Sequence, residues 1–409
     1  MHIKYVGEIT DPIHRYIRFT EVEKKIIDTK IFQRLRRIRQ LAGAHLVYPS
    51  AQHSRFEHSL GTMHLAGLAG ETMFSKNYIN EEDIQKLRLA ALLHDIGHGP
   101  FSHLFEEVLA NKTQLSHEEM GKMIITKTEI SDIVKKFGYS TRDICNLSFG
   151  NYKTKFFNEL LSGGLSVDIM DYLPRDSYFT GTEYGKLDYY RLISSMEISS
   201  KGHLSLNKSS IYSLESMLIS RYEMFKAVYF HKTVRSAEVM LLNSMIFADN
   251  DLNLSTANLD EFLLFTDETL IDKICFLGDK NQLASKLAHD YRNRKLLKCV
   301  YEKFFYNRKR FDKITYKRRI KKIKSKVLQN TTISESDIYI DLSIAPSMPL
   351  TPKKDELNFI ILIDKEQEYE TPIYNLPLFK AMTGFLDMVR IYSHVEIRDK
   401  LKNLDSIIQ

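Results

Sequence analysis

The sequence lacks the features that mark secreted and membrane proteins. Only three cysteines occur among 409 residues, at positions 145, 275 and 299, which are too few and too scattered for a disulfide framework or a thiolate zinc site. No apolar run approaches the roughly 20 residues of a membrane-spanning helix, and no signal peptide is recognised at the start. We therefore expect a cytoplasmic protein without membrane contacts, in which histidine and carboxylate side chains hold any metal.

Positive charge is concentrated in one strip. The net charge is +6, but residues 301–326 carry twelve Lys and Arg residues against two acids, which leaves about −4 for the rest of the chain. A basic strip needs an anionic partner or a solvated face. Three interpretations stay open: it binds an activator triphosphate, it binds nucleic acid non-specifically, or it is the polar face of an amphipathic helix, as the spacing of Ile320, Ile323 and Val327 indicates.

Helical patterns dominate the first part of the chain. We predict a mainly α protein, with a helical core over residues 1–250 and a smaller α+β lobe over residues 251–409. Helices are predicted over residues 21–41, 59–76, 82–96, 118–128, 154–162, 165–173, 188–196 and 211–248. After residue 250 the chain is first polar and irregular and then helical and basic to about residue 328, so the basic strip 301–326 is predicted to be helical. Strands are predicted over residues 2–8, 203–206, 338–344 and 359–364, followed by a helix over 378–388 and a strand over 389–393.

Histidine is unusually dense in one stretch. Eight of the fourteen histidines lie between His45 and His117. A run of strong helix formers ends at the pair His94-Asp95, and glycines and a proline follow it. An isolated His-Asp pair is commonly a solvated helix end, but core packing does not explain this density, because histidine is a poor core residue.

Three separate segments can supply the ligands of one cation. They contain His58, the pair His94-Asp95, and Asp168. Two histidines and two aspartates from different helices can converge in the core of a helical bundle. Such a mixed nitrogen and oxygen site suits Mg²⁺, Mn²⁺, Fe²⁺, Ni²⁺ or Zn²⁺, and the sequence does not choose among them. A cation there lowers the pKa of bound water and polarises a phosphoryl oxygen.

Many short blocks then occur in a recognisable order. The blocks are Asp11–His14, Ile27–Thr29, Phe32–Ile38, Gln40–Leu41, Tyr48–Ala51, Arg55–Gly61, His94–His103 and Asp168–Asp176. Together they resemble the HD-domain deoxynucleoside triphosphate triphosphohydrolases, in the branch whose vertebrate members combine SAM and HD domains. The resemblance covers residues 1 to about 240, and no SAM domain is expected before Asp11.

The resemblance implies roles for individual residues. The implied metal ligands are His58, His94, Asp95 and Asp168. The implied catalytic residues, which contact phosphates or transfer protons, are His98, His103, His117 and Glu106. The implied substrate-binding residues are Gln40, Leu41, Arg55, Tyr172, Asp176, Arg221 and Tyr229. Gln40 and Asp176 match groups that bind the 3′-hydroxyl, and Leu41 matches the residue that crowds the 2′ position. Two positions depart from the pattern: Ile169 stands where the best-studied family member has a phosphate-contacting Lys, and Phe225 replaces a family His near the substrate.

The same resemblance suggests regulation and assembly. Asp28, Gln33 and Arg36 match a triad that reads guanine at an activator site, which implies a GTP or dGTP-type activator. Gly7 stands where a phosphate-binding Lys is expected, so this site departs from the pattern. Family members form dimers or tetramers, and we therefore expect a homo-oligomer.

These features predict a metal-dependent hydrolase of dNTPs that cleaves at the α-phosphate and releases deoxynucleoside and inorganic triphosphate. Two alternatives remain. One is another HD-domain phosphohydrolase, such as a nucleotidase, a phosphodiesterase or a nuclease. The other is a nucleic-acid-binding protein that uses residues 301–326 and carries a vestigial site.

Overall fold

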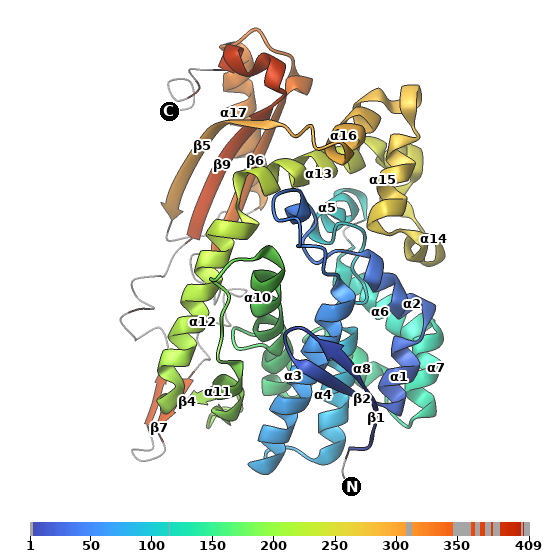
Figure 1. Cartoon of the computed structure of the whole chain (residues 1–409), viewed down its shortest axis with the longest axis vertical. Helices are drawn as coiled ribbons and strands as arrows, with labels where there is room; N and C mark the ends of the chain where they lie inside the picture. The colour runs from blue at the N-terminus through green and yellow to red at the C-terminus, as the bar shows by residue number, and fades with distance from the viewer. Residues whose placement is uncertain are drawn as a thin grey trace.

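The computed structural model describes residues 3–113, 115–307, 313–346, 361–364, 369–372, 378, 385–401 and 404. Within them the chain is mainly helical, with small sheets at its margins (Figure 1), so the predicted fold class is confirmed. The helices are α1 (Glu21–Ile27), α2 (Lys30–Gln33), α3 (Arg55–Ser75), α4 (Glu81–Leu93), α5 (His103–Lys112), α6 (His117–Lys127), α7 (Glu129–Lys136), α8 (Thr141–Ser148), α9 (Lys155–Ser162), α10 (Val167–Thr180), α11 (Tyr189–Ser194), α12 (Ile211–Met224), α13 (Lys232–Leu252), α14 (Leu259–Leu264), α15 (Asp267–Cys275), α16 (Gln282–Arg292) and α17 (Lys313–Gln329).

Three small sheets surround the helices. Their strands are β1 (Tyr5–Asp11), β2 (Arg15–Thr20), β3 (Met196–Ile198), β4 (Leu204–Asn207), β5 (Lys298–Asn307), β6 (Ile338–Pro346), β7 (Ile361–Asp364), β8 (Tyr369–Pro372) and β9 (Phe385–Ser393). β1 and β2 form a hairpin, and β5, β9 and β6 form an antiparallel sheet in that order. The remaining sheet has the order β3-β4-β7-β8, in which only β4 and β7 are parallel.

The antiparallel pair α3 and α4 forms the centre of the helical part (Figure 1). Ser54 caps α3, because its hydroxyl accepts from the Phe56 N–H and Glu57 reaches back to the Ser54 N–H in a capping box. Glycines allow close packing: a Cβ on Gly67 would lie 2.4 Å from an Arg88 guanidinium nitrogen. The start of α3 therefore lies beside the end of α4, which brings two histidine-bearing segments together.

Two large apolar clusters lie on either side of this centre. One includes Phe56, Leu92 and Phe105 and extends to α13, α15 and α16. The other includes Leu65 and Ile169 and extends to α9 and α12. Side chains of α3, α5, α6, α10 and α12, and of the segment that follows α4, line one cavity, which the predicted metal ligands and substrate-binding residues share. No helix among the described residues is long and apolar enough to cross a bilayer.

Several predicted elements were wrong in extent or type. The single helix predicted over 21–41 is broken, because the Thr29 hydroxyl accepts from the Phe32 N–H and starts a new helix. The long helix predicted over 211–248 is α12 and α13, separated by a π-helical turn, Phe225–Tyr229. Helices α5, α7 and α8 were not predicted. The strand predicted over 2–8 is β1, shifted toward the hairpin turn.

The basic strip was predicted as helical throughout, and this was also wrong. Residues 298–307 form β5, which pairs with β9 along its whole length. Aromatic and β-branched side chains favour a strand here, and pairing with β9 overrides the charge pattern. Residues 385–388, predicted as helix, belong to β9, while residues 359–360 and 379–384 lie outside the described part.

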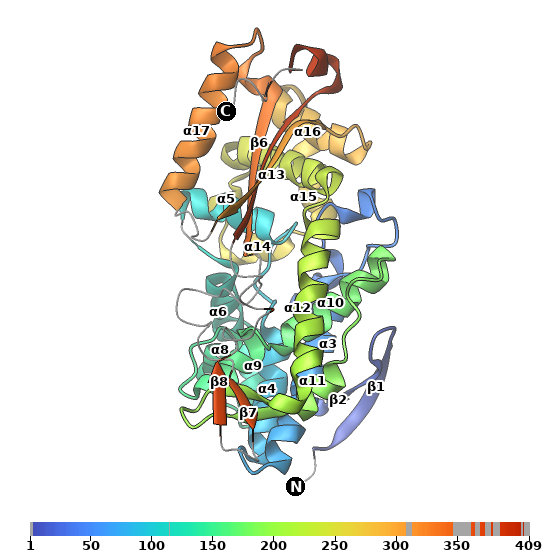
Figure 2. The same ribbon diagram turned by 90° about the vertical axis from the view of Figure 1, so that its left-hand side faces the viewer.

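Helix α17 carries the second half of the strip and lies against the sheet beside β6 (Figure 2). Ile323 and Val327 are buried there with Ile338 and Leu342. The amphipathic interpretation of this helix is thus confirmed for its apolar face. The predicted domain boundary at residue 250 stays a prediction.

Candidate metal centre and active-site cavity

The four predicted metal ligands lie together. α3 carries His58, the end of α4 carries His94 and Asp95, and the first turn of α10 carries Asp168. His58 Nε2 lies 3.0 Å from Asp168 Oδ1 and 3.7 Å from Asp95 Oδ2. His94 Nε2 lies 3.3 Å from Asp95 Oδ1 and 3.8 Å from Asp168 Oδ1. Neighbouring ligands at these separations fit around one cation with bonds of about 2.0–2.2 Å.

Both histidines present Nε2 to this centre. His94 Nδ1 lies 2.7 Å from the Ala91 carbonyl oxygen, which can only accept, so Nδ1 carries the proton. His58 Nδ1 lies 2.8 Å from Asp171 Oδ2 and donates to it. His94 Nε2 is buried and has no hydrogen-bond partner among the residues that the structure describes. A buried lone pair without a donor is costly, and a cation satisfies it. The residues present therefore fit a divalent metal ion.

A buried network of charged side chains orients His58. Arg175 donates from Nε and Nη2 to the two carboxylate oxygens of Asp171, at 2.8 and 2.9 Å, and from Nη1 to Asp11 at 2.8 Å. His14 Nε2 lies 2.6 Å from Asp171 Oδ1. These side chains are all buried. The sequence did not indicate this role for Asp171, Arg175 or His14, although Asp171 and Arg175 stand one and two helical turns beyond Asp168 on α10.

The centre is strongly anionic. Burial opposes protonation of His58, yet the carboxylates of Asp168 and Asp171 outweigh it and raise the pKa of His58 to about 10. Burial alone would raise the pKa of Asp168, but the hydrogen bond from His58 and the nearby imidazole of His94 hold that pKa below its usual range. The carboxylates that attract a proton to His58 attract a metal ion for the same electrostatic reason.

The centre forms one wall of a cavity of about 560 Å³. The predicted substrate-binding residues all line this same cavity, which they share with the four candidate ligands: Gln40, Leu41, Arg55, Tyr172, Asp176, Arg221 and Tyr229. Two of them present buried polar atoms that lack a partner within the described residues, namely Gln40 Oε1 and Arg221 Nε. A cavity of this size suits a small polar ligand, and its unsatisfied groups are available to bind one.

Arg55 and Asp176 occupy different parts of the cavity wall. The Arg55 guanidinium pairs with Asp95 and donates from Nε to Ser102 Oγ at 2.7 Å. Asp176 accepts from Tyr229 Oη at 2.6 Å and lies 2.7 Å from His53 Nε2. His53 is buried and stacks on Phe179, and no sequence pattern indicated its contact with Asp176.

Comparison with known protein families identifies two regions of this chain. Residues 55–175 match the HD domain, and residues 187–358 match the HD-associated region. The chain is an HD-domain protein. The family resemblance expected from the sequence blocks is therefore confirmed, and the four candidate ligands lie within the HD domain.

Several relatives extend the comparison. An uncharacterised protein of Methanocaldococcus jannaschii is 38% identical over 277 residues, which cover 65% of this chain and 57% of that protein. A Dictyostelium discoideum homologue of the deoxynucleoside triphosphate triphosphohydrolase SAMHD1 is 32% identical over 309 residues, 72% of this chain and 60% of that protein. A hypothetical protein from Aquifex aeolicus of known structure has a TM-score of 0.79 at 29% identity, covering 97% of this chain and 99% of its own. The chain spans about three fifths of the length of these curated relatives.

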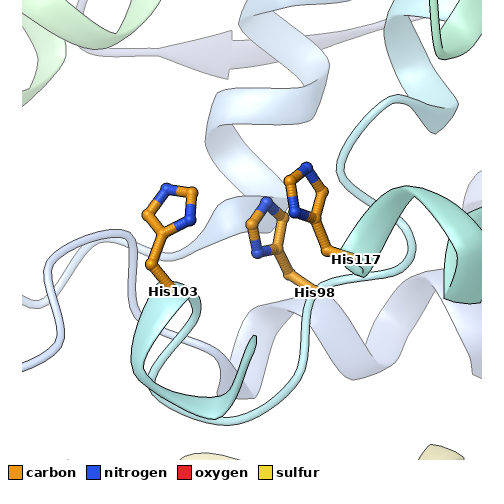
Figure 3. Close-up of side chains that lie close together, drawn as sticks. All are labelled: His98, His103 and His117. Atoms are coloured by element: carbon orange, nitrogen blue, oxygen red, sulfur yellow. The ribbon is translucent and has the colours of Figure 1, made fainter. Parts of the chain in front are cut away.

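Three further histidines of the HD domain gather beside the centre (Figure 3). His98 and His117 stack with ring centroids 4.2 Å apart and planes inclined by 12°, and His103 stands at 87° to His98. The lone pairs of the stacked His98 and His117 rings lie in nearly parallel planes, so these two rings do not converge on one ion unless one of them turns. As arranged, this group is suited to proton transfer and anion contact rather than to chelation.

Glu106 links two of these histidines. Its Oε2 lies 3.0 Å from His117 Nδ1 and 3.4 Å from His103 Nδ1. Burial would raise the pKa of Glu106, but the hydrogen bonds of His103 and His117 hold it well below the usual range. Burial and the Arg55 charge lower the pKa of His98 well below its usual value. A carboxylate thus orients His117 beside a neutral, stacked His98.

The predicted activator triad lies away from the cavity lining. Gln33 donates from Nε2 to the Ile27 carbonyl at 2.8 Å and accepts from Arg36 Nε at 2.8 Å. The Arg36 guanidinium stacks over the Phe56 ring, with its carbon 3.5 Å from the ring centroid. Asp28 ends α1. A guanine-reading role for these three residues stays a prediction.

Proposed function

We propose that this HD-domain protein is a metal-dependent hydrolase of deoxynucleoside triphosphates, which releases deoxynucleoside and inorganic triphosphate. One observation carries the proposal. The unpartnered Nε2 of His94 faces the carboxylates of Asp95 and Asp168 on the wall of a cavity that the expected phosphate- and sugar-binding residues also line. Homology to a Dictyostelium SAMHD1 homologue supports the choice of substrate class.

The residues suggest how the reaction proceeds. His58, His94, Asp95 and Asp168 would hold a divalent cation, which would supply an activated water and polarise a phosphoryl oxygen. Arg55 and Arg221 bind phosphate oxygens, because a guanidinium pairs with them bidentately and remains charged.

Proton transfer falls to the histidine group. Water adds to the α-phosphorus as the bond from phosphorus to the 5′-oxygen breaks, and the leaving oxygen takes a proton from His117. Glu106 accepts the Nδ1–H of His117 and so keeps Nε2 directed away from itself. The hydroxyl of the attacking water remains on triphosphate, and the deoxynucleoside leaves with its 5′-hydroxyl. The other proton of the water passes to solvent, and His117 takes up a proton from solvent before the next turnover.

Other residues of the cavity wall would bind the sugar. Asp176 and Gln40 bind the 3′-hydroxyl in this proposal, and Leu41 excludes a 2′-hydroxyl by its bulk. The partly buried Leu41 packs against one of the apolar clusters and carries no polar group that could hydrogen-bond to a 2′-hydroxyl. Deoxynucleotides are therefore preferred on steric grounds.

Product analysis tests the proposal. The metal-free protein is reloaded with Mn²⁺, Mg²⁺, Fe²⁺, Ni²⁺ or Zn²⁺ and incubated with each dNTP and with all four together. We expect deoxynucleoside and triphosphate as products, and no hydrolysis by Asp168→Asn. Formation of dNMP or dNDP would reject cleavage at this bond, and it would favour another phosphohydrolase chemistry. Activity confined to the mixture would support an activator site at Asp28, Gln33 and Arg36.

A further inference from the structure

The turn that connects the His94-Asp95 segment to α5 is strained. Phe101 and Ser102 have φ angles of +56° and +55°, and Ser102 has ψ of −115°. They are the only adjacent non-glycine pair with positive φ in the described part of the chain. Both are buried, with 1% and 4% exposure. Side-chain-bearing residues avoid this region, and such strain persists only where the surroundings hold it.

The strained turn lies next to the expected phosphate-binding groups. The Ser102 hydroxyl accepts from Arg55 Nε at 2.7 Å and donates to the Arg39 carbonyl at 3.3 Å. Arg55 in turn pairs with Asp95. His103 follows directly and begins α5. The direction of Arg55 and the start of the helix bearing His103 and Glu106 thus both depend on the backbone of two residues.

A carboxylate from a distant part of the chain holds this turn. Asp267, the first residue of α15 in the HD-associated region, is 1% exposed. Its Oδ1 accepts from the Phe101 N–H at 2.8 Å, across 166 residues of sequence. Its Oδ2 accepts from the Arg39 N–H at 3.0 Å and lies 3.5 Å from Arg39 Nη1. One buried carboxylate therefore accepts hydrogen bonds from the Phe101 N–H in the strained turn and from the N–H of Arg39, whose carbonyl accepts from Ser102.

We propose that Asp267 is a positioning residue, which holds the Phe101–Ser102 turn in its strained form and so directs Arg55 and His103 toward the substrate phosphates. Without a carboxylate at this place the buried Phe101 N–H and the partly buried Arg39 N–H lose their acceptor, and the turn loses the contact that ties it to α15. Ser102 Oγ then leaves Arg55. Asp267 itself contributes to catalysis in this way without contacting substrate.

The variant Asp267→Asn tests this inference with little change in volume. An amide keeps one acceptor oxygen and turns a donor toward the other N–H group, so one contact is lost. Glu268→Gln is the matched control, because Glu268 is the next residue, pairs with Arg39 at 2.8 Å and has a side chain that is 65% exposed. Amide hydrogen exchange of peptides covering residues 97–106 reports the turn directly. We expect exchange there to rise about tenfold or more in Asp267→Asn and to stay unchanged in Glu268→Gln.

A merely structural role predicts a different pattern. It predicts faster exchange throughout the molecule, including α13, and an equal loss of bound metal. Exchange that is unchanged at residues 97–106, or raised equally everywhere, would overturn the inference. This measurement needs no substrate, and it stays decisive if the protein hydrolyses no dNTP and the proposed function fails.

The catalytic part of the inference rests on the proposed function. We expect Asp267→Asn to lower kcat by about tenfold or more while the metal content stays that of the wild type, because small displacements of reacting groups cost large factors in rate. Ser102→Ala removes the hydroxyl between the turn and Arg55, and we expect a similar loss. If Asp267 acts through Ser102, the double variant is no slower than the slower single variant. If the two losses in kcat multiply in the double variant, Asp267 does not act through Ser102. If Asp267→Asn does not fold, the exchange and kcat of Ser102→Ala alone decide: wild-type values for both contradict the inference.

Discussion

Nδ1 of His58 lies 2.8 Å from Oδ2 of Asp171, and neither side chain reaches solvent. This contact fixes which nitrogen of His58 faces the candidate metal centre. Because Asp171 is itself held by Arg175 and His14, the ring cannot turn without breaking a buried ionic network. The ligand geometry is therefore built into the packing of α3 against α10.

Removing the charge of Asp171 should weaken metal binding without removing a ligand. We expect Asp171→Asn to lower the affinity for Mn²⁺ by about 10–100-fold, the usual effect of losing the carboxylate partner of a ligating histidine. Calorimetric titration of the metal-free protein measures it. Asp188→Asn, which changes an exposed helix cap on α11, serves as the control. Unchanged affinity in Asp171→Asn would show that the network has no influence on the centre.

A methyl group at Gly61 should disrupt the same contact. A Cβ there would lie 1.8 Å from Asp171 Oδ1, so Gly61→Ala must displace the carboxylate. We expect lost metal affinity together with a destabilisation of roughly 1–3 kcal/mol, as for overpacked cores. Gly70→Ala is the comparison, since its Cβ would contact Ile84 at 2.9 Å, on the same helix but away from the centre. That variant should lose stability and keep its affinity for metal.

Protons should compete with the metal ion. With the pKa of His58 raised to about 10 by Asp168 and Asp171, His58 is protonated at neutral pH in the metal-free protein and must release a proton on binding. Affinity for Mn²⁺ should rise about tenfold per pH unit between pH 6.5 and 8.5 for each proton released. Titrations in buffers of different ionisation enthalpy count those protons. An affinity independent of pH would contradict the assignment of His58 as a ligand.

Acid should destabilise the fold through His64. Burial, with the nearby His14 and Arg88 charges, lowers the pKa of His64 to about 4 from the ordinary 6.5. Between these values the unfolded chain binds more protons than the folded one, so the free energy of unfolding falls as the pH falls. The contribution of His64 is at most about 3 kcal/mol across this window. In urea unfolding at pH 7 and pH 5, His64→Gln should lose less stability than the wild type, and equal losses would contradict this origin.

The sequence was sufficient to predict which site residues come together where these residues stand in short, characteristic sequence blocks. His94 and Asp95 are adjacent, and His58 and Asp168 lie in blocks of several characteristic residues, so their convergence could be expected. The contacts of Asp171 with His14 and of Asp267 with Phe101 span 157 and 166 residues. No local pattern carries such information, because it depends on how helices pack.

The errors in the fold have a similar physical cause. Residues 298–307 form a strand, which their aromatic and β-branched side chains favour and pairing with β9 stabilises, although the prediction grouped residues 301–307 with the basic helix that follows. The helix predicted over 21–41 ends early because the Thr29 hydroxyl caps a new one. At Thr29 one capping contact outweighed a helical propensity spread over many residues, since intrinsic preferences amount to only tenths of a kcal/mol for each residue.

Metal analysis by mass spectrometry tests the central claim most directly. After reloading and gel filtration, the wild type should retain one divalent ion per chain, and Asp168→Ala should lose it while Asp279→Ala, a change at an exposed position, keeps it. Both variants should stay folded by circular dichroism. A wild type that retains no ion, or an Asp168→Ala protein that binds metal as tightly as the wild type, would contradict a centre built from His58, His94, Asp95 and Asp168.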